Sequence, residues 1–212
     1  MQRLTEVAFQ HSRSGVFTRD EAAHWAGGRG ARLDALLKRA MAEGEITRAH
    51  RGLYCLDDRY TRRKVDPLEL AQRIHGPSYI SMETALAQHG WIPEGVRSIE
   101  SASVGRSRTF DTPFGRFGFT SVPKHAFLGG VRRAIGNSEQ AFFLATPLTA
   151  LADLVYSRKL DWSSMEPLVE SLRIDEENLE GLGAQDFEET LPCYPPGRAR
   201  RFLEGLRKEL GR

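Results

Sequence analysis

Residues 18–56, TRDEAAHWAGGRGARLDALLKRAMAEGEITRAHRGLYCL, hold the signals that decide the fold of the first part of the chain. Thr18, followed three residues later by Glu21, forms a capping-box pattern that predicts a helix over about 19–26. After a glycine-rich turn, apolar residues recur at helical spacing and predict a further helix over 31–42. Its core-facing stripe is expected to consist of Leu33, Leu36, Leu37, Ala40 and Met41.

The residues after this helix have the pattern of a β-hairpin. Strand-forming side chains predict strands over 45–48 and 52–56 around a tip at 49–51. Apolar side chains at the spacing of one helical face predict another helix over 2–12. The resulting order is helix, helix, turn, helix and hairpin, which is the order of a winged helix-turn-helix. We therefore predict such a DNA-binding domain over residues 1–66, with its last helix in the major groove.

Basic side chains recur on the two elements that a winged helix turns toward DNA. Arginine suits this role because its guanidinium group can bind guanine edges and phosphates in a bidentate manner. Any one of these bases alone is typical of a solvated surface, whereas their recurrence on both elements favours DNA binding. A further basic cluster follows the hairpin over 59–64. The candidate DNA-binding residues are Arg29, Arg32, Lys38, Arg39, Arg48, His50 and Arg51.

The rest of the chain has the pattern of a mixed α/β domain. Asp66-Pro67 is typical of a helix start, and we place the domain boundary there. Strands are predicted at 79–80, 98–104, 109–122 with a turn near Pro113, and 140–145. Helices are predicted at 68–74, 82–89 and 148–155, with Ser81 and Thr146 as caps, and near the end with Phe202, Leu203, Leu206 and Leu210 on one side. The sequence thus predicts an α+β protein with a winged helix-turn-helix domain over 1–66 and an α/β domain over 67–212.

Charge is distributed unevenly, although the formal net charge is only +2. Residues 1–66 carry a net charge of +4, whereas residues 151–212 carry −4. Within the latter part, residues 161–189 hold ten acidic side chains and one basic one, and residues 198–212 hold six basic and two acidic ones. Such clusters are typical of solvated helix faces, and their asymmetry is also a first indication of interaction surfaces.

Composition and motifs argue against an enzyme. The 212 residues, with 40% apolar and 27% charged side chains, are typical of a globular protein. Cys55, Cys193 and the six histidines have no metal-ligand spacing. The Gly27–Gly30 run follows a helix and lacks the lysine of a phosphate-binding loop. No apolar run is long enough to cross a bilayer. We expect no catalytic residue, metal, cofactor or membrane contact, and a cytoplasmic location.

Three features have more than one interpretation. Gly105–Arg108 is either a turn between strands or a second basic contact with nucleic acid. His89 stands at a helix end and is more typical of a cap or packed residue than of a catalytic base. The acidic runs at 175–177 and 188–189 could hold a metal, although such runs are usually solvated helix starts.

A series of short motifs resembles the AbiEi-type antitoxins of type IV toxin–antitoxin systems. The motifs lie in order over about residues 15–160, and they are Arg51-Gly52-Leu53-Tyr54, Tyr79-Ile80-Ser81, Ala85-Leu86, His89-Gly90, Ile92-Pro93-Glu94, Arg108-Thr109-Phe110, Thr112-Pro113-Phe114-Gly115, Ala145-Thr146-Pro147 and Ala150-Leu151-Ala152-Asp153-Leu154. The resemblance implies a bacterial protein with an N-terminal winged helix and a C-terminal antitoxin domain. It also implies repression of its own operon through promoter DNA. The functional partner would be a nucleotidyltransferase-like toxin, counteracted without a stable complex. The acidic segment 161–189 lies outside the resemblance.

The residues alone leave two other classes of function open. A winged-helix adaptor would use the acidic segment to dock a basic partner. A DNA-directed enzyme would need a cluster of metal-binding carboxylates beside its DNA-binding domain.

Overall fold

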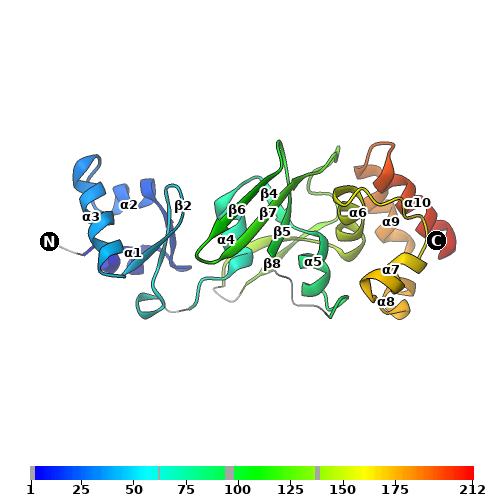
Figure 1. Cartoon of the computed structure of the whole chain (residues 1–212), viewed down its shortest axis with the longest axis horizontal. Coiled ribbons are helices and arrows are strands. Elements are labelled where there is room, and N and C mark those ends of the chain that lie inside the picture. The colour runs from blue at the N-terminus through cyan, green and yellow to red at the C-terminus, as the bar shows by residue number, and fades with distance from the viewer. Residues whose placement is uncertain (1–2, 62, 94–97, 137–138) are drawn as a thin grey trace. The chain divides into compact units, whose positions relative to one another are not determined.

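We describe the protein from a computed structural model that covers residues 3–61, 63–93, 98–136 and 139–212. Helices and strands are mixed along the chain (Figure 1). Their contacts group into two compact units. The first unit comprises residues 1–74, 111–115 and 134–142, and the second comprises residues 75–110, 116–133 and 143–212.

The first unit contains three helices and a small antiparallel sheet in its N-terminal part. The elements are α1 (Leu4–His11), β1 (Val16–Thr18), α2 (Arg19–Trp25), α3 (Ala31–Ala42), β2 (Ile46–His50) and β3 (Leu53–Leu56), followed by the 3-10 helix η1 (Asp58–Tyr60) and by α4 (Pro67–Ile74). The strand order is β1-β3-β2. Apolar side chains of the helices and the sheet share one core, which includes Leu4, Phe17, Leu33, Leu37 and Tyr54.

Local sequence signals explain where these helices start and which face they bury. The Thr18 hydroxyl accepts from the Glu21 N–H at 3.1 Å, and the Glu21 carboxylate accepts from the Thr18 N–H at 2.6 Å, which confirms the capping box. The helix predicted over 31–42 has these bounds. Its stripe is narrower than expected, because Met41 is 37% exposed whereas Leu33 and Leu37 are buried.

The hairpin differs from the sequence-based expectation. Strand β2 continues through Ala49 and His50, so the tip is Arg51-Gly52 and the predicted tip at 49–51 is wrong. A register shift between Arg48 and His50 accommodates the extra residue, and Ala49 is buried. Strand β1 was not expected, because three residues are too few to show an alternating pattern.

A six-stranded mixed sheet contains the strands that follow α4 in the chain. They are β4 (Ser78–Ile80), β5 (Ser98–Ser103), β6 (Arg108–Thr112), β7 (Gly115–Ser121), β8 (Val131–Ile135) and β9 (Ala141–Ala145), in the order β6-β7-β5-β4-β9-β8. Strand β4 is antiparallel to β5 and parallel to β9, while β5 is parallel to β7. The predicted strands are confirmed, whereas β8 was missed because Arg132 and Arg133 interrupt its apolar pattern at the sheet edge.

Seven helical segments complete the second unit. They are α5 (Met82–Gln88), α6 (Pro147–Ser157), α7 (Glu166–Leu172), α8 (Glu176–Glu180), α9 (Ala184–Thr190), the 3-10 helix η2 (Leu191–Cys193) and α10 (Arg198–Glu209). Helix α5 packs against β5 and α6, and α6 also contacts α9 and α10. Helix α6 is buried on all sides from Leu148 to Val155, which makes it the centre of this unit. The last helix buries Phe202, Leu203 and Leu206 as predicted, whereas Leu210, the fourth residue of the predicted apolar side, is the C-cap and is half-buried.

Candidate nucleic-acid interface

Helix α3 presents basic side chains on the side that its core residues leave free. Burial of Leu33, Leu37 and Ala40 fixes the rotation of the helix about its axis. The opposite side is exposed, and it includes the small side chain of Ala35. The exposed candidate residues here are Arg32, Lys38 and Arg39, with Arg29 in the turn that precedes the helix.

The hairpin carries the remaining candidate residues. Arg51 lies in the exposed turn, and Arg48 is exposed on β2. The Arg48 Nε donates to the His50 carbonyl oxygen at 3.4 Å, and the His50 side chain is half-buried. Within the part of the chain that the structure describes, Arg29, Lys38 and Arg51 form no ion pair. These three cations therefore keep their hydrogen-bond donors available to a phosphate or a base edge.

Arg19 joins the hairpin to α3, and sequence analysis did not single it out. Its backbone N–H donates to the Gly52 carbonyl oxygen in the hairpin turn at 2.8 Å. Its guanidinium Nη2 donates to the Asp34 Oδ1 in the first turn of α3 at 2.7 Å. This hydrogen bond and the charge of Asp34 raise the pKa of Arg19. Arg19 thus ties both basic elements to the start of α2, and it neutralises the acid at the edge of the basic face.

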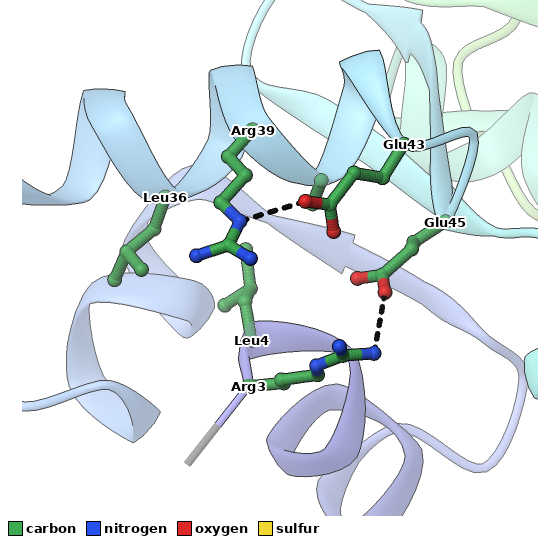
Figure 2. A pocket seen from close by; sticks show the side chains of 7 residues that line it. Arg3, Leu4, Leu36, Arg39, Glu43 and Glu45 are labelled. Carbon is green, nitrogen blue, oxygen red and sulfur yellow. Dashed lines mark hydrogen bonds and ion pairs between the residues drawn. The ribbon is translucent and has the colours of Figure 1, made fainter. Parts of the chain in front are cut away.

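Arg39 faces a hollow between α3 and the start of α1. Its Nε donates to Glu43 Oε1 at 2.8 Å, one helical turn along α3. This bond and the charge of Glu43 raise the pKa of Arg39. Figure 2 shows Arg39 and Arg3 approaching the same hollow, with Glu43 and Glu45 beside them. Arg39 therefore differs from Lys38, because Arg39 already forms an ion pair with Glu43.

The basic cluster over 59–64 is largely neutralised by acids. Arg59 donates to Asp57 Oδ1 at 2.6 Å and to the Gly44 carbonyl oxygen at 2.9 Å. Arg63 pairs with Glu139, and Lys64 lies 3.9 Å from Asp58. The fourth member, Arg62, lies outside the described residues, as does Glu94 of the sequence motifs. The cluster is thus a weaker candidate for DNA contact than α3 and the hairpin turn.

A second group of polar residues lies at the buried centre of the second unit. The Asp153 carboxylate has no exposed surface, and it accepts hydrogen bonds from Tyr79 at 2.8 Å, Ser81 at 2.7 Å and Tyr194 at 2.6 Å. Burial raises the pKa of Asp153, and the nearby Lys124 ammonium opposes that rise. Lys124 lies 5.0 Å from the centre of the Tyr79 ring, and burial lowers its pKa. Each charge is therefore paired or hydrogen-bonded, as a buried ion requires.

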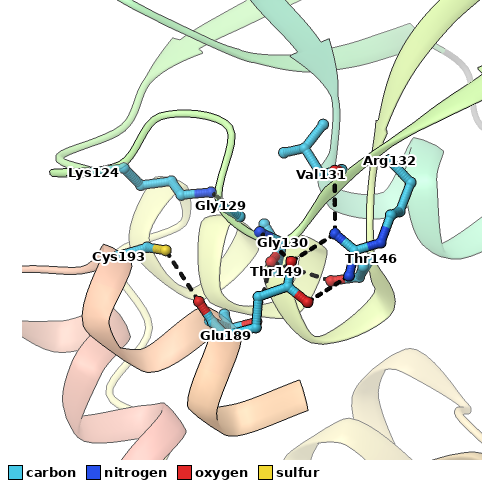
Figure 3. A network of polar contacts seen from close by, with 10 residues as sticks. Lys124, Gly129, Gly130, Val131, Arg132, Thr146, Thr149, Glu189 and Cys193 are labelled. Carbon is cyan, nitrogen blue, oxygen red and sulfur yellow. Dashed lines mark hydrogen bonds and ion pairs between the residues drawn. The ribbon is translucent and has the colours of Figure 1, made fainter. Parts of the chain in front are cut away.

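An ion pair extends this group toward the sheet edge. Glu189 on α9 accepts from Arg132 Nη1 at 2.6 Å and from the Gly130 N–H at 3.2 Å (Figure 3). Lys124 donates to the Gly129 carbonyl oxygen at 2.6 Å, and the Cys193 thiol donates to the Glu189 carbonyl oxygen at 3.2 Å. Burial raises the pKa of Cys193, so this thiol is a weak nucleophile. The Glu189 contacts thus join α9 to β8 and to the turn that precedes it.

Several residues from the sequence motifs have positions that bear on these alternatives. Ser81 precedes α5 as expected, but its hydroxyl donates to Asp153 and makes no capping bond. His89 ends α5, and its Nε2 lies 2.8 Å from the Ala145 carbonyl oxygen. Arg106 and Arg108 flank the exposed β5–β6 turn. Among the described residues, no three His, Cys, Asp or Glu side chains gather as metal ligands would, and no helix is suited to span a bilayer.

No protein-family model matches the chain, and no curated protein matches it.

Proposed function

We propose that the protein binds its own promoter DNA through residues 1–66, with α3 as the recognition helix of a winged helix-turn-helix and the β2–β3 hairpin as its wing. The observation that carries this proposal is the pair of hydrogen bonds made by Arg19. Its backbone N–H donates to Gly52 in the hairpin turn, and its guanidinium group donates to Asp34 in α3. Two basic elements are thereby held in one framework. An α-helix fits the major groove of DNA, and a hairpin beside it can reach the phosphate backbone.

The candidate residues then have distinct roles. Arg32 and Lys38 on α3 contact base edges or the flanking phosphates, and Arg29 contacts phosphate at the start of the helix. Arg48, His50 and Arg51 contact phosphates along the wing. Arg39 joins them only when its bond to Glu43 opens. This opening costs little, because both side chains of the pair are exposed and solvent screens their attraction.

We also propose that the protein is an antitoxin that represses its own operon and counteracts a nucleotidyltransferase-like toxin. The support is the resemblance to AbiEi-type antitoxins. Two of the motifs that carry it are Tyr79-Ile80-Ser81 and Ala150–Leu154. The Tyr79 and Ser81 hydroxyls of the first motif donate to the Asp153 carboxylate of the second, although Ser81 and Asp153 are 72 residues apart in the sequence. Sequence motifs that converge on one buried group are expected when they specify one fold.

Fluorescence anisotropy with the promoter duplex tests the DNA-binding proposal. We expect the logarithm of affinity to fall linearly with the logarithm of salt, with a slope of about 0.9 per phosphate contact. Lys38→Ala and Arg51→Ala should each weaken binding. Arg32→Ala should in addition reduce the difference in binding free energy between the promoter and a duplex with the contacted base pair changed. The reduction should be about 1–3 kcal/mol if Arg32 binds a guanine in a bidentate manner.

Lys208→Ala is the matched control, because Lys208 is an exposed helical lysine of the second unit. Its affinity for the promoter should equal that of the natural chain. Equal affinity for promoter and random duplex would overturn the proposal of sequence-specific binding. A control variant that weakened binding as much as Lys38→Ala would overturn the assignment of the interface to residues 1–66.

Growth with an induced toxin tests the antitoxin proposal in the full chain. A variant carrying Lys38→Ala and Arg51→Ala should lose promoter repression and still protect the cells, because the two activities are assigned to different parts of the chain. Loss of protection by this variant at a normal protein level would contradict that assignment. A natural chain that fails to protect would overturn the antitoxin proposal and leave the DNA-binding proposal standing.

A further inference from the structure

A hollow of about 210 Å³ lies between the start of α1 and the C-terminal half of α3. Its apolar wall includes Leu4 and Leu36, and its charged residues are Arg3, Arg39, Glu43 and Glu45. Figure 2 shows the two ion pairs, Arg39 with Glu43 and Arg3 with Glu45, facing this space. The hollow is smaller than the roughly 300–1,000 Å³ of pockets that hold drug-sized ligands, so a small metabolite fits it better.

Both ion pairs are open to solvent, and only Glu45 among their four side chains is buried. Glu45 is fixed, because its side chain is only 7% exposed and it accepts from the Thr5 hydroxyl. Its partner Arg3 is 62% exposed and lies 3.4 Å away. The Arg39–Glu43 pair is also open to solvent, with side chains 66% and 40% exposed. Exposed pairs contribute little to stability, so a ligand can exchange its own charges for them at small cost.

We propose that this hollow binds a free α-amino acid with an apolar side chain. The ligand carboxylate would replace Glu43 as the partner of the Arg39 guanidinium, which accepts a carboxylate in a bidentate manner. Its ammonium group would lie with the released Glu43 and with Glu45, the buried acid of the hollow. Its side chain would cover Leu4 and Leu36. The charges of the hollow sum to zero, which suits a zwitterion and disfavours a simple anion or cation.

This site adds a regulatory step that rests on the proposed function. Arg39 belongs to the proposed DNA-binding face of α3, and a bound amino acid would hold its guanidinium group in the hollow. Promoter affinity should then fall as the amino acid binds. Ligand binding itself can be measured without DNA, so failure of the DNA-binding proposal and failure of this one are distinguishable.

Isothermal titration calorimetry of the full chain with L-leucine tests the proposal directly. Leucinamide, which lacks the carboxylate, and 4-methylpentanoate, which lacks the ammonium group, serve as matched ligands. We expect saturable binding of L-leucine, and binding of each analogue about tenfold weaker or more, as expected from the loss of one charge-assisted hydrogen bond. Absence of saturable heat for L-leucine, L-methionine and L-phenylalanine at millimolar concentration would overturn the proposal. Equal affinity for 4-methylpentanoate would overturn it in favour of a simple anion site.

Variants locate the site. Arg39→Gln should weaken L-leucine binding by about tenfold or more, and Glu43→Gln should weaken it in the same direction, because each removes one charged partner. Both side chains are exposed, so neither substitution disturbs the core. Arg201→Gln, at an exposed arginine of α10, is the matched control and should leave the affinity unchanged. If Arg39→Gln bound L-leucine with the affinity of the natural chain, the amino acid would bind elsewhere, and the assignment would be overturned.

Discussion

Two regions of the molecule use charged side chains in opposite ways, namely the exposed residues of α3 and the hairpin and the buried centre of the second unit. On α3 and the hairpin, cations such as Lys38 and Arg51 are exposed and form no ion pair among the described residues. At the centre of the second unit, Asp153 is fully buried and accepts three hydrogen bonds. Exposed charges contribute little to folding and are available for binding, whereas a buried charge must be satisfied within the fold. Charged side chains are therefore open to binding in one region and form a structural centre in the other.

The largest expected effect comes from breaking the buried centre. Asp153→Ala removes the common acceptor of the Tyr79, Ser81 and Tyr194 hydroxyls and leaves the Lys124 ammonium without its buried counter-charge. Removing one partner of a buried charged network typically costs about 3–5 kcal/mol, and we expect a loss of this size in the free energy of unfolding. Urea denaturation followed by circular dichroism measures it.

Asp161→Ala is the matched control for Asp153→Ala. Asp161 is 78% exposed and lies 3.2 Å from Arg198. Its removal should cost less than about 1 kcal/mol, because exposed ion pairs are weak. If both variants lost the same free energy, the contrast between the two kinds of charge would be wrong.

A smaller difference is expected between two glycine variants, one close to the buried centre and one away from it. Gly130 has a backbone φ of +66°, and a Cβ built on it would overlap the Thr149 Oγ1. Gly90 has a φ of +72°, but a Cβ there would meet nothing within 4 Å. Alanine at either site carries the cost of a left-handed conformation, about 1–2 kcal/mol. Gly130→Ala should lose about 1–3 kcal/mol more of its unfolding free energy, because its new Cβ overpacks the site. Equal thermal stabilities of the two variants would contradict the close packing at Thr149.

Local features of this fold were predictable from sequence, and the long-range ones were not. Thr18 and Glu21 stand three residues apart, and Leu33 and Leu37 four apart, so helix geometry alone places them. By contrast, Tyr79 and Asp153 are 74 residues apart, and Arg19 and Asp34 are 15 apart. No periodic pattern connects such pairs. Arg19 could have been suspected, because it starts a capped helix and Asp34 is an acid at the edge of the basic face.

The smallest expected effect tests an intermediate case, a charge that is neither buried nor free. Glu21 closes the capping box of α2 and accepts from the Arg73 Nη2 at 2.6 Å. Partial burial raises the pKa of Glu21, but the Thr18 N–H and the Arg73 charge outweigh burial and lower it overall. A carboxylate with a lowered pKa stabilises the fold above its unfolded pKa of about 4.3, and this stabilisation is lost as the pH falls through the folded value.

Glu21→Gln should therefore destabilise the protein at neutral pH and have little effect in acid. The difference at neutral pH should stay below about 1 kcal/mol, because the Glu21 side chain is 39% exposed and solvent screens its ion pair. Glutamine keeps an oxygen that can accept from the Thr18 N–H, so the variant isolates the charge from the capping bond. Urea denaturation at neutral pH and again below the depressed pKa measures both differences. The difference in free energy of unfolding between the natural chain and the variant should not increase toward acid pH. An increase would show that burial, rather than Thr18 and Arg73, dominates the pKa of Glu21.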